Sequence, residues 1–147
     1  MKKLILLLMV ASTMLANAKN GKQQPPAAAN PVATLMVEFE SNLNWSAVVD
    51  NWKKARGPWV TATNGCSDAA CVAKKLVEFE VNTKWGDVNP KWKVRRAGWI
   101  KECAAAKTNA SVAKLLVEFE SYVAWESVAE AWKARRDGWM KACAAVK

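Results

Sequence analysis

A 40-residue period constrains this chain more than any other feature of its sequence. The segment Leu-Met-Val-Glu-Phe-Glu at residue 35 returns as Lys-Leu-Val-Glu-Phe-Glu at 75 and as Leu-Leu-Val-Glu-Phe-Glu at 115. Residues 72–107 match residues 112–147 at 21 of 36 positions. Such a period is typical of helical repeats, whose units bury their apolar faces only against one another. We therefore expect three tandem copies, 32–71, 72–111 and 112–147, in a single domain of residues 32–147.

Apolar residues within each copy recur at the spacing of helices. In the third copy, Val112, Leu115 and Phe119 share one face of a helix with 3.6 residues per turn. A second helix carries the second and third tryptophans of each copy. In each copy a helix breaker stands immediately before the third tryptophan, so each copy could contain either two or three helices. These breakers are Pro58, Gly98 and Gly138.

A strand interpretation competes with the first helix. Residues 77–85 alternate between apolar and polar side chains, which gives an α+β alternative with the Val-Glu-Phe-Glu segments as strands. Ser41 and Ser121 would then fall on the buried face, and copies this similar share one fold, so helices are favoured. We predict an all-α protein in which three helical hairpins form one small bundle or a short solenoid.

The start of the chain has the pattern of an exported protein. Residues 1–18 combine Lys2 and Lys3, an apolar run and the sequence Ala-Asn-Ala at 16–18, which predicts a cleavable signal peptide. Residues 19–31 are rich in Pro, Ala and Gln, the composition of a flexible leader. No later stretch is long and apolar enough to cross a membrane. We expect a secreted or periplasmic protein that is not transmembrane after cleavage.

Four cysteines in an exported chain predict disulfides rather than metal or redox sites. They allow three pairings, and the sequence does not choose among them. Cys71 could bond to Cys103 with Cys66 reaching Cys143, or Cys66 could bond to Cys71 with Cys103 left to Cys143. Two segments, at Asn44 and Asn109, also match the N-glycosylation pattern, which is used only in organisms that glycosylate exported proteins.

Nine tryptophans occur three to a copy, seven residues apart. The first of each copy, Trp45, Trp85 and Trp125, falls at the turn between helices, and we consider these three as exposed binding platforms. The second and third lie on one helical face with an arginine between them, which predicts structural stacks of a guanidinium against two rings. These stacks are Trp52, Arg56 and Trp59; Trp92, Arg96 and Trp99; and Trp132, Arg136 and Trp139.

The composition argues against catalysis. The chain has no histidine, which excludes Ser-His-Asp and Cys-His nucleophiles and most zinc and haem sites. Paired glutamates such as Glu38 and Glu40 are two residues apart and do not face each other on a helix, so a glycan-acting enzyme is a distant third hypothesis. We expect these glutamates to neutralise the arginines of the second helix. No enzyme activity, cofactor or metal is predicted.

The positive charge is concentrated in the middle copy. The chain has a net charge of +9, and residues 72–107 carry nine basic and four acidic side chains. Lys91, Lys93 and Arg95 are the candidate binding cations. Export argues against genomic nucleic acid as the partner. We predict a binding protein, with a protein partner first and an anionic envelope surface, lipid headgroups or acidic glycan, as the alternative.

Overall fold

The computed structural model describes residues 29–84, 89–124 and 128–147, and within them six α-helices carry the fold. The segment predicted as a signal peptide, the predicted leader up to residue 28, Trp85 and Trp125 lie outside the described residues. No strand occurs in the described ranges, only two isolated bridges, so the all-α prediction is confirmed and the α+β alternative is wrong. The helices are α1 (Pro31–Ser41), α2 (Trp52–Asn64), α3 (Ala69–Val81), α5 (Pro90–Ala105), α6 (Asn109–Tyr122) and α7 (Glu130–Ala144), with a short 3-10 helix η1 (Trp45–Ala47).

Capping residues fix where the helices begin. The Asn30 side chain accepts hydrogen bonds from the backbone amides of Val32 and Ala33, and Asp68 does the same for Cys71. Pro31 and Pro90 stand in the first turn of their helices, where a missing amide hydrogen costs nothing. Asn30 and Pro31 therefore belong to the domain, although the sequence places them in the leader.

Within the described residues each copy contains two α-helices, because the helix breakers do not end the second helix. α2 continues through Pro58, and α5 and α7 continue through their glycines. At Gly98 a side chain would come within 2.8 Å of the Arg95 guanidinium, and Gly138 stands in the same relation to Arg135. The glycines thus make room for arginines that cross the helix surface.

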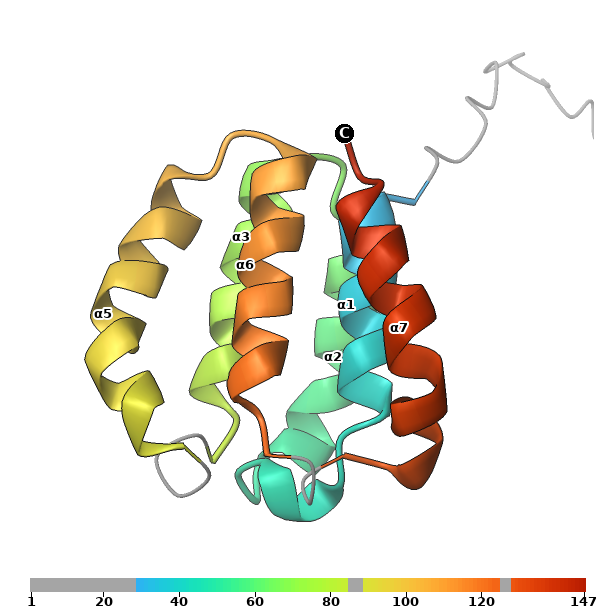
Figure 1. Ribbon diagram of the computed structural model, residues 1–147, viewed down its shortest axis with the longest axis vertical. Coiled ribbons are helices and arrows are strands. Elements are labelled where there is room, and N and C mark those ends of the chain that lie inside the picture. The colour runs from blue at the N-terminus through green and yellow to red at the C-terminus, as the bar shows by residue number, and fades with distance from the viewer. Residues whose placement is uncertain (1–28, 85–88, 125–127) are drawn as a thin grey trace, which may run out of the picture.

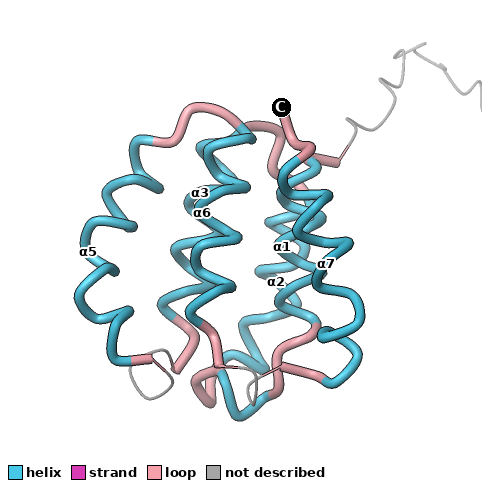
Figure 2. Tube along the Cα trace, in the orientation of Figure 1, coloured by secondary structure: helices cyan, strands magenta, loops and turns pink. Residues whose placement is uncertain are grey.

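The six helices form two tiers, with the first helix of each copy inside. α1, α3 and α6 contact one another, and α2, α5 and α7 pack outside them (Figure 1). Figure 2 shows the helices running along one direction, joined by short loops at the two ends. Phe39, Phe79 and Phe119 meet edge to face at the centre, with ring centroids 5.5–6.2 Å apart.

Contacts between copies close the bundle. Trp59 Nε1 donates to the Lys75 carbonyl of the next copy, and Trp99 Nε1 donates to the Leu115 carbonyl. The third copy returns to the first, because Trp139 Nε1 donates to the Leu35 carbonyl at 2.9 Å. The last hairpin therefore packs on the first, as in a closed bundle rather than an open solenoid. No helix in the described part of the chain has both the length and the apolar character of a membrane span.

Candidate binding face on the middle copy

A buried glutamate in each copy ties the two helices of the hairpin together. Glu80 is fully buried and accepts from Trp92 Nε1 at 2.8 Å, from Arg96 Nε at 2.6 Å and from Arg96 Nη2 at 2.8 Å. Glu40 and Glu120 hold the matching tryptophan and arginine of their own copies. These carboxylates are occupied in structural hydrogen bonds.

The predicted sandwich of an arginine between two tryptophans is wrong. The centroids of Trp52 and Trp59 lie 5.3 Å apart, and the matching pairs in the other copies lie 5.2 Å apart. Rings this close leave no space for a guanidinium between them. A charge-assisted bond to a buried carboxylate is stronger than a cation–π contact, so the arginines turn to the glutamates instead.

Six of the seven described tryptophans are core residues, each at most 2% exposed. Trp45 differs, because it is 49% exposed and the Lys53 Nζ lies 5.6 Å from its ring centroid. It borders a small hollow of about 110 Å³ that Ser41 and Arg56 also line. Of the three tryptophans expected at the surface, the structure thus places one there, and Trp85 and Trp125 fall outside the described residues.

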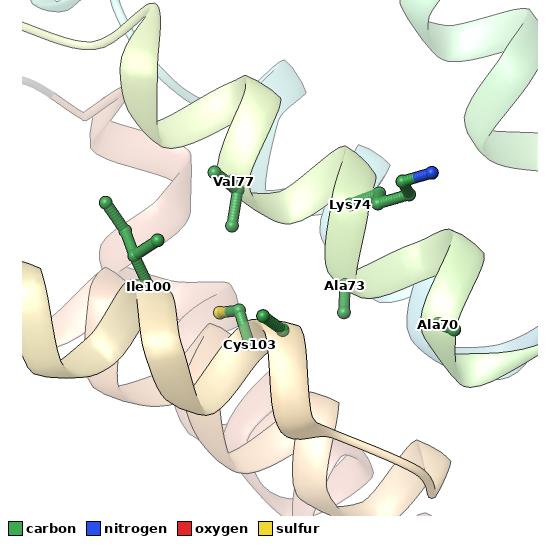
Figure 3. Close-up of a pocket in the computed structure, with 7 residues that line it drawn as sticks. Ala70, Ala73, Lys74, Val77, Ile100 and Cys103 are labelled. Atoms are coloured by element: carbon green, nitrogen blue, oxygen red, sulfur yellow. The ribbon is translucent and has the colours of Figure 1, made fainter.

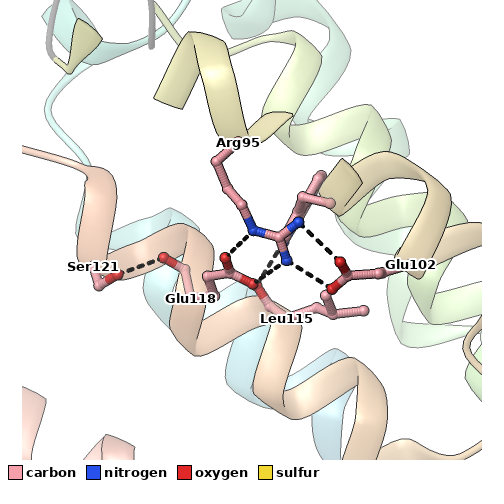
Figure 4. A network of polar contacts seen from close by, with 6 residues as sticks. Arg95, Glu102, Leu115, Glu118 and Ser121 are labelled. Atoms are coloured by element: carbon pink, nitrogen blue, oxygen red, sulfur yellow. Dashed lines mark hydrogen bonds and ion pairs between the residues drawn. The ribbon is translucent and has the colours of Figure 1, made fainter. Parts of the chain in front are cut away.

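Arg95, expected among the binding cations, is occupied by two carboxylates. Its guanidinium donates to Glu102 at 2.7 and 2.9 Å on its own helix and to both oxygens of Glu118 on α6 (Figure 4). The hydrogen bonds that Arg95 donates to Glu102 and Glu118 raise the pKa of Arg95 above its ordinary value. Arg135 bonds to Glu38 of α1 in the same way. Arg95 therefore joins the second and third copies and is not a free cation.

Lys91, Lys93 and Lys101 of α5 carry charges that no described residue neutralises, and we call these three residues the lysine face. All three side chains are exposed, and no carboxylate in the described part of the chain lies within 4.0 Å of them. Val94 lies among them and is 89% exposed. Lys91 and Lys93 are two residues apart and project on opposite flanks of the exposed side of α5, and Lys101 projects between them, about 80° from each around the helix axis. Lys101 was not among the expected binding cations.

The corresponding faces of the other copies are not cationic in this way. On α7 the Lys133 Nζ bonds to Glu130 at 2.9 Å, and Asp137 takes the position of Ala97. On α2 the lysine at the matching position lies over the Trp45 ring. The lysine face is therefore a departure of the middle copy from the repeat pattern.

A groove between α3 and α5 borders the lysine face. It encloses about 420 Å³, and the buried side chains of Ala73 and Cys103 form its floor. Val77 of α3 and Ile100 of α5 face each other across it, and Lys74 lies beside it on α3 (Figure 3). The groove could not be predicted from the sequence, because it depends on how the two helices are spaced.

One disulfide is present, between Cys66 and Cys71, whose Cα atoms are 5.5 Å apart. Cys103 and Cys143 are free thiols, so the expectation that all four cysteines pair is wrong. They occupy matching positions on separate outer helices, and Cys103 packs against its own copy's α3, where no thiol faces it. Burial, followed by the nearby Glu102 charge, raises the pKa of Cys103 to about 12.

The described residues contain no group of three His, Cys, Asp or Glu side chains that could hold a metal ion. Comparison with protein-family models, with curated proteins and with solved structures finds no match to this chain.

Proposed function

We propose that this chain is an exported, non-catalytic protein that binds an acidic surface of a partner protein through the lysine face of α5. The observation that carries this proposal is the set of three exposed lysines, next to the exposed Val94, with no carboxylate within 4.0 Å among residues 29–84, 89–124 and 128–147. A cationic rim around an apolar residue is the arrangement with which a protein surface selects an acidic partner.

The state of the glutamates supports binding rather than catalysis. Glu40, Glu80 and Glu120 are buried and hydrogen-bonded, and Glu38 and Glu118 are engaged by arginines of the neighbouring copy. A general acid or base needs a carboxyl group within reach of a substrate proton. These side chains are instead directed at the protein's own tryptophans and arginines.

The burial of the tryptophans supports a protein partner over a lipid surface. An interfacial helix presents aromatic rings and cations together on its exposed side. In residues 132–139, the segment whose composition most suggests such a helix, Trp132 and Trp139 are both fully buried, and Arg136 bonds to Glu120. Of the tryptophans that the structure describes, all except Trp45 therefore belong to the core.

Export is part of the proposal and is supported by two features. The signal-like segment at residues 1–18 is one. The Cys66–Cys71 disulfide is the other, because disulfides persist in oxidising compartments.

The test removes the charge of the lysine face and compares the partner affinity of that variant with the affinity of a variant that lacks three lysines elsewhere. K91Q/K93Q/K101Q neutralises the face, and K133Q/K141Q/K147Q removes three exposed lysines from the third copy. Each protein is used to capture partners from the native exported fraction, and the captured partner is then purified and titrated. At about 0.5 kcal/mol per lysine, the first variant should bind roughly tenfold more weakly and the second as well as wild type.

Equal binding by both variants would contradict the proposal. Vesicles containing phosphatidylglycerol and a soluble acidic polysaccharide are titrated in parallel. If the wild type binds either of these through the same lysines and captures no protein, the anionic-surface alternative replaces the protein partner.

A further inference from the structure

We infer that the groove between α3 and α5 receives an amphipathic helix of the partner, with the apolar side of that helix in the groove and its acidic side against the lysines. This inference rests on the proposed function and specifies which structure the partner presents. The groove walls are Val77 and Ile100, and its floor is Ala73 and Cys103 (Figure 3).

The apolar surface continues beyond the hollow. Val81 follows Val77 by one helical turn and is 53% exposed. Because Glu80 accepts hydrogen bonds from Trp92 and Arg96, the turn that contains Val81 lies beside residues 92–96 of α5. The strip that a partner can cover therefore extends along both helices.

The middle copy differs from both other copies at one position of this strip. Ser41 and Ser121 stand where Val81 does, whereas Ala104 is replaced by Asn64 in the first copy and is kept as Ala144 in the third. The two serines show that folding of the repeat does not need an apolar side chain at this position. The Val81 side chain is exposed and adds nothing to the core, so its effect is to make the surface more apolar.

Lysines border the strip on both helices. Lys74 shares a row with Ala70 and Val77 on α3. Lys93 precedes Ile100 by seven residues, two helical turns, and so lies on the same side of α5. Both side chains are exposed and have no carboxylate within 4.0 Å in the described ranges.

Charge complementarity selects the occupant. A helix in a groove between two helices is held by apolar side chains at intervals of three and four residues. The alanines at positions 70, 73 and 104 leave space for such side chains to enter. Cations on both rims then favour glutamate or aspartate on the flanks of the incoming helix and disfavour lysine or arginine.

The test uses a synthetic probe, a capped amphipathic peptide of about 18 residues, five helical turns, with leucines on one face and glutamates on its flanks. A control peptide keeps the leucines and replaces every glutamate by lysine. Binding is measured by fluorescence anisotropy and mapped by amide chemical shifts on the full mature chain. We expect the acidic peptide to bind at least tenfold more tightly than the control and to shift resonances of α3 and α5.

Two matched variants locate the site. Ala104→Glu places a carboxylate in the groove, and Ala144→Glu makes the same change at the equivalent exposed position of α7. Thermal unfolding followed by circular dichroism verifies that both fold. Ala104→Glu should weaken binding of the acidic peptide at least tenfold, whereas Ala144→Glu should leave it unchanged.

The outcomes separate this inference from the proposed function. If the acidic peptide does not bind at about 1 mM, or shifts residues outside α3 and α5, the inference is overturned. If Ala104→Glu retains full affinity for the natural partner while K91Q/K93Q/K101Q loses it, the partner does not bind in the groove. In that case the inference fails, and the proposed function, binding through the lysine face, is supported. If neither variant affects the natural partner, both proposals fail.

Discussion

Replacing the buried carboxylate of the middle copy should destabilise the fold severely, although Glu80→Gln preserves side-chain shape. Glu80 is fully buried and accepts three hydrogen bonds, one from Trp92 and two from Arg96. A glutamine oxygen can still accept, but its amide group would face the Arg96 guanidinium as donor against donor. Removing one member of a buried pair costs about 3–5 kcal/mol. Because the Arg96 side chain keeps 27% of its exposure, we expect a value near the lower end, about 3 kcal/mol.

Urea unfolding followed by tryptophan fluorescence measures this loss, and thermal unfolding should show a midpoint lower by roughly 10 °C. Glu78→Gln is the matched control, two residues earlier on the same helix. Its side chain is 46% exposed and pairs with Lys75 alone among the described residues, so the control should cost under about 0.5 kcal/mol. If Glu80→Gln is as stable as Glu78→Gln, the carboxylate does not hold the hairpin together, and the reasoning for all three copies is refuted.

Four further changes test other parts of the structure. Thr63→Val should raise stability by about 1 kcal/mol, because the buried Thr63 hydroxyl lacks a hydrogen-bond partner within the described chain; a lower urea midpoint would show that the hydroxyl is satisfied. Cys103, with its pKa raised to about 12, should react with a thiol reagent at pH 8 roughly 1000-fold more slowly in folded than in urea-unfolded protein, and equal rates would show that it is not buried. The double change Ala55→Arg/Pro58→Gly supplies the arginine that the first copy lacks opposite Glu78, together with the glycine that makes room for it in the other copies. Compared with Pro58→Gly alone, it should add up to about 1 kcal/mol, measured at low salt, where the pair is screened least; no gain over Pro58→Gly would contradict this geometry. The pKa of Glu102 is lowered chiefly by the hydrogen bond from its arginine, so its contribution is present above pH 4.5 and is lost as the pH falls through its folded-state pKa; Glu102→Gln should be less stable than wild type at pH 7, and the difference should vanish in acid.

The repeat pattern predicted the fold class because it shows both which face of each helix is apolar and that equivalent faces recur in all three copies. Helical spacing of apolar residues such as Leu115 and Phe119 determines which face is buried, and those faces are the ones that meet at the centre. The pattern could not distinguish a closed bundle from an open solenoid. A closed bundle requires the third copy to pack against the first. The hydrogen bond from Trp139 to the Leu35 carbonyl shows that contact.

The site was predicted less completely because ion pairing depends on neighbours distant in sequence. Lys91, Lys93 and Arg95 are equally cationic in the sequence, but Arg95 meets Glu118, 23 residues away, and is neutralised. The predicted sandwiches of an arginine between two tryptophan rings do not form, for a similar reason. Spacing along one helix places the arginine and both tryptophans on one face, but Arg96 donates its hydrogen bonds to the buried Glu80 of the adjacent helix.

The most direct test of the account asks whether the partner lies against α5 of the middle copy. A photo-crosslinking amino acid, benzoylphenylalanine, is placed at Val94, which is 89% exposed, and in a separate protein at Ala134, the matching exposed position of α7. Both proteins are produced in the native host and irradiated, and the crosslinked peptide is identified by mass spectrometry. We expect position 94 to crosslink to an acidic segment of one protein and position 134 to give no such crosslink. Crosslinks of equal yield from both positions, or from position 134 alone, would contradict it.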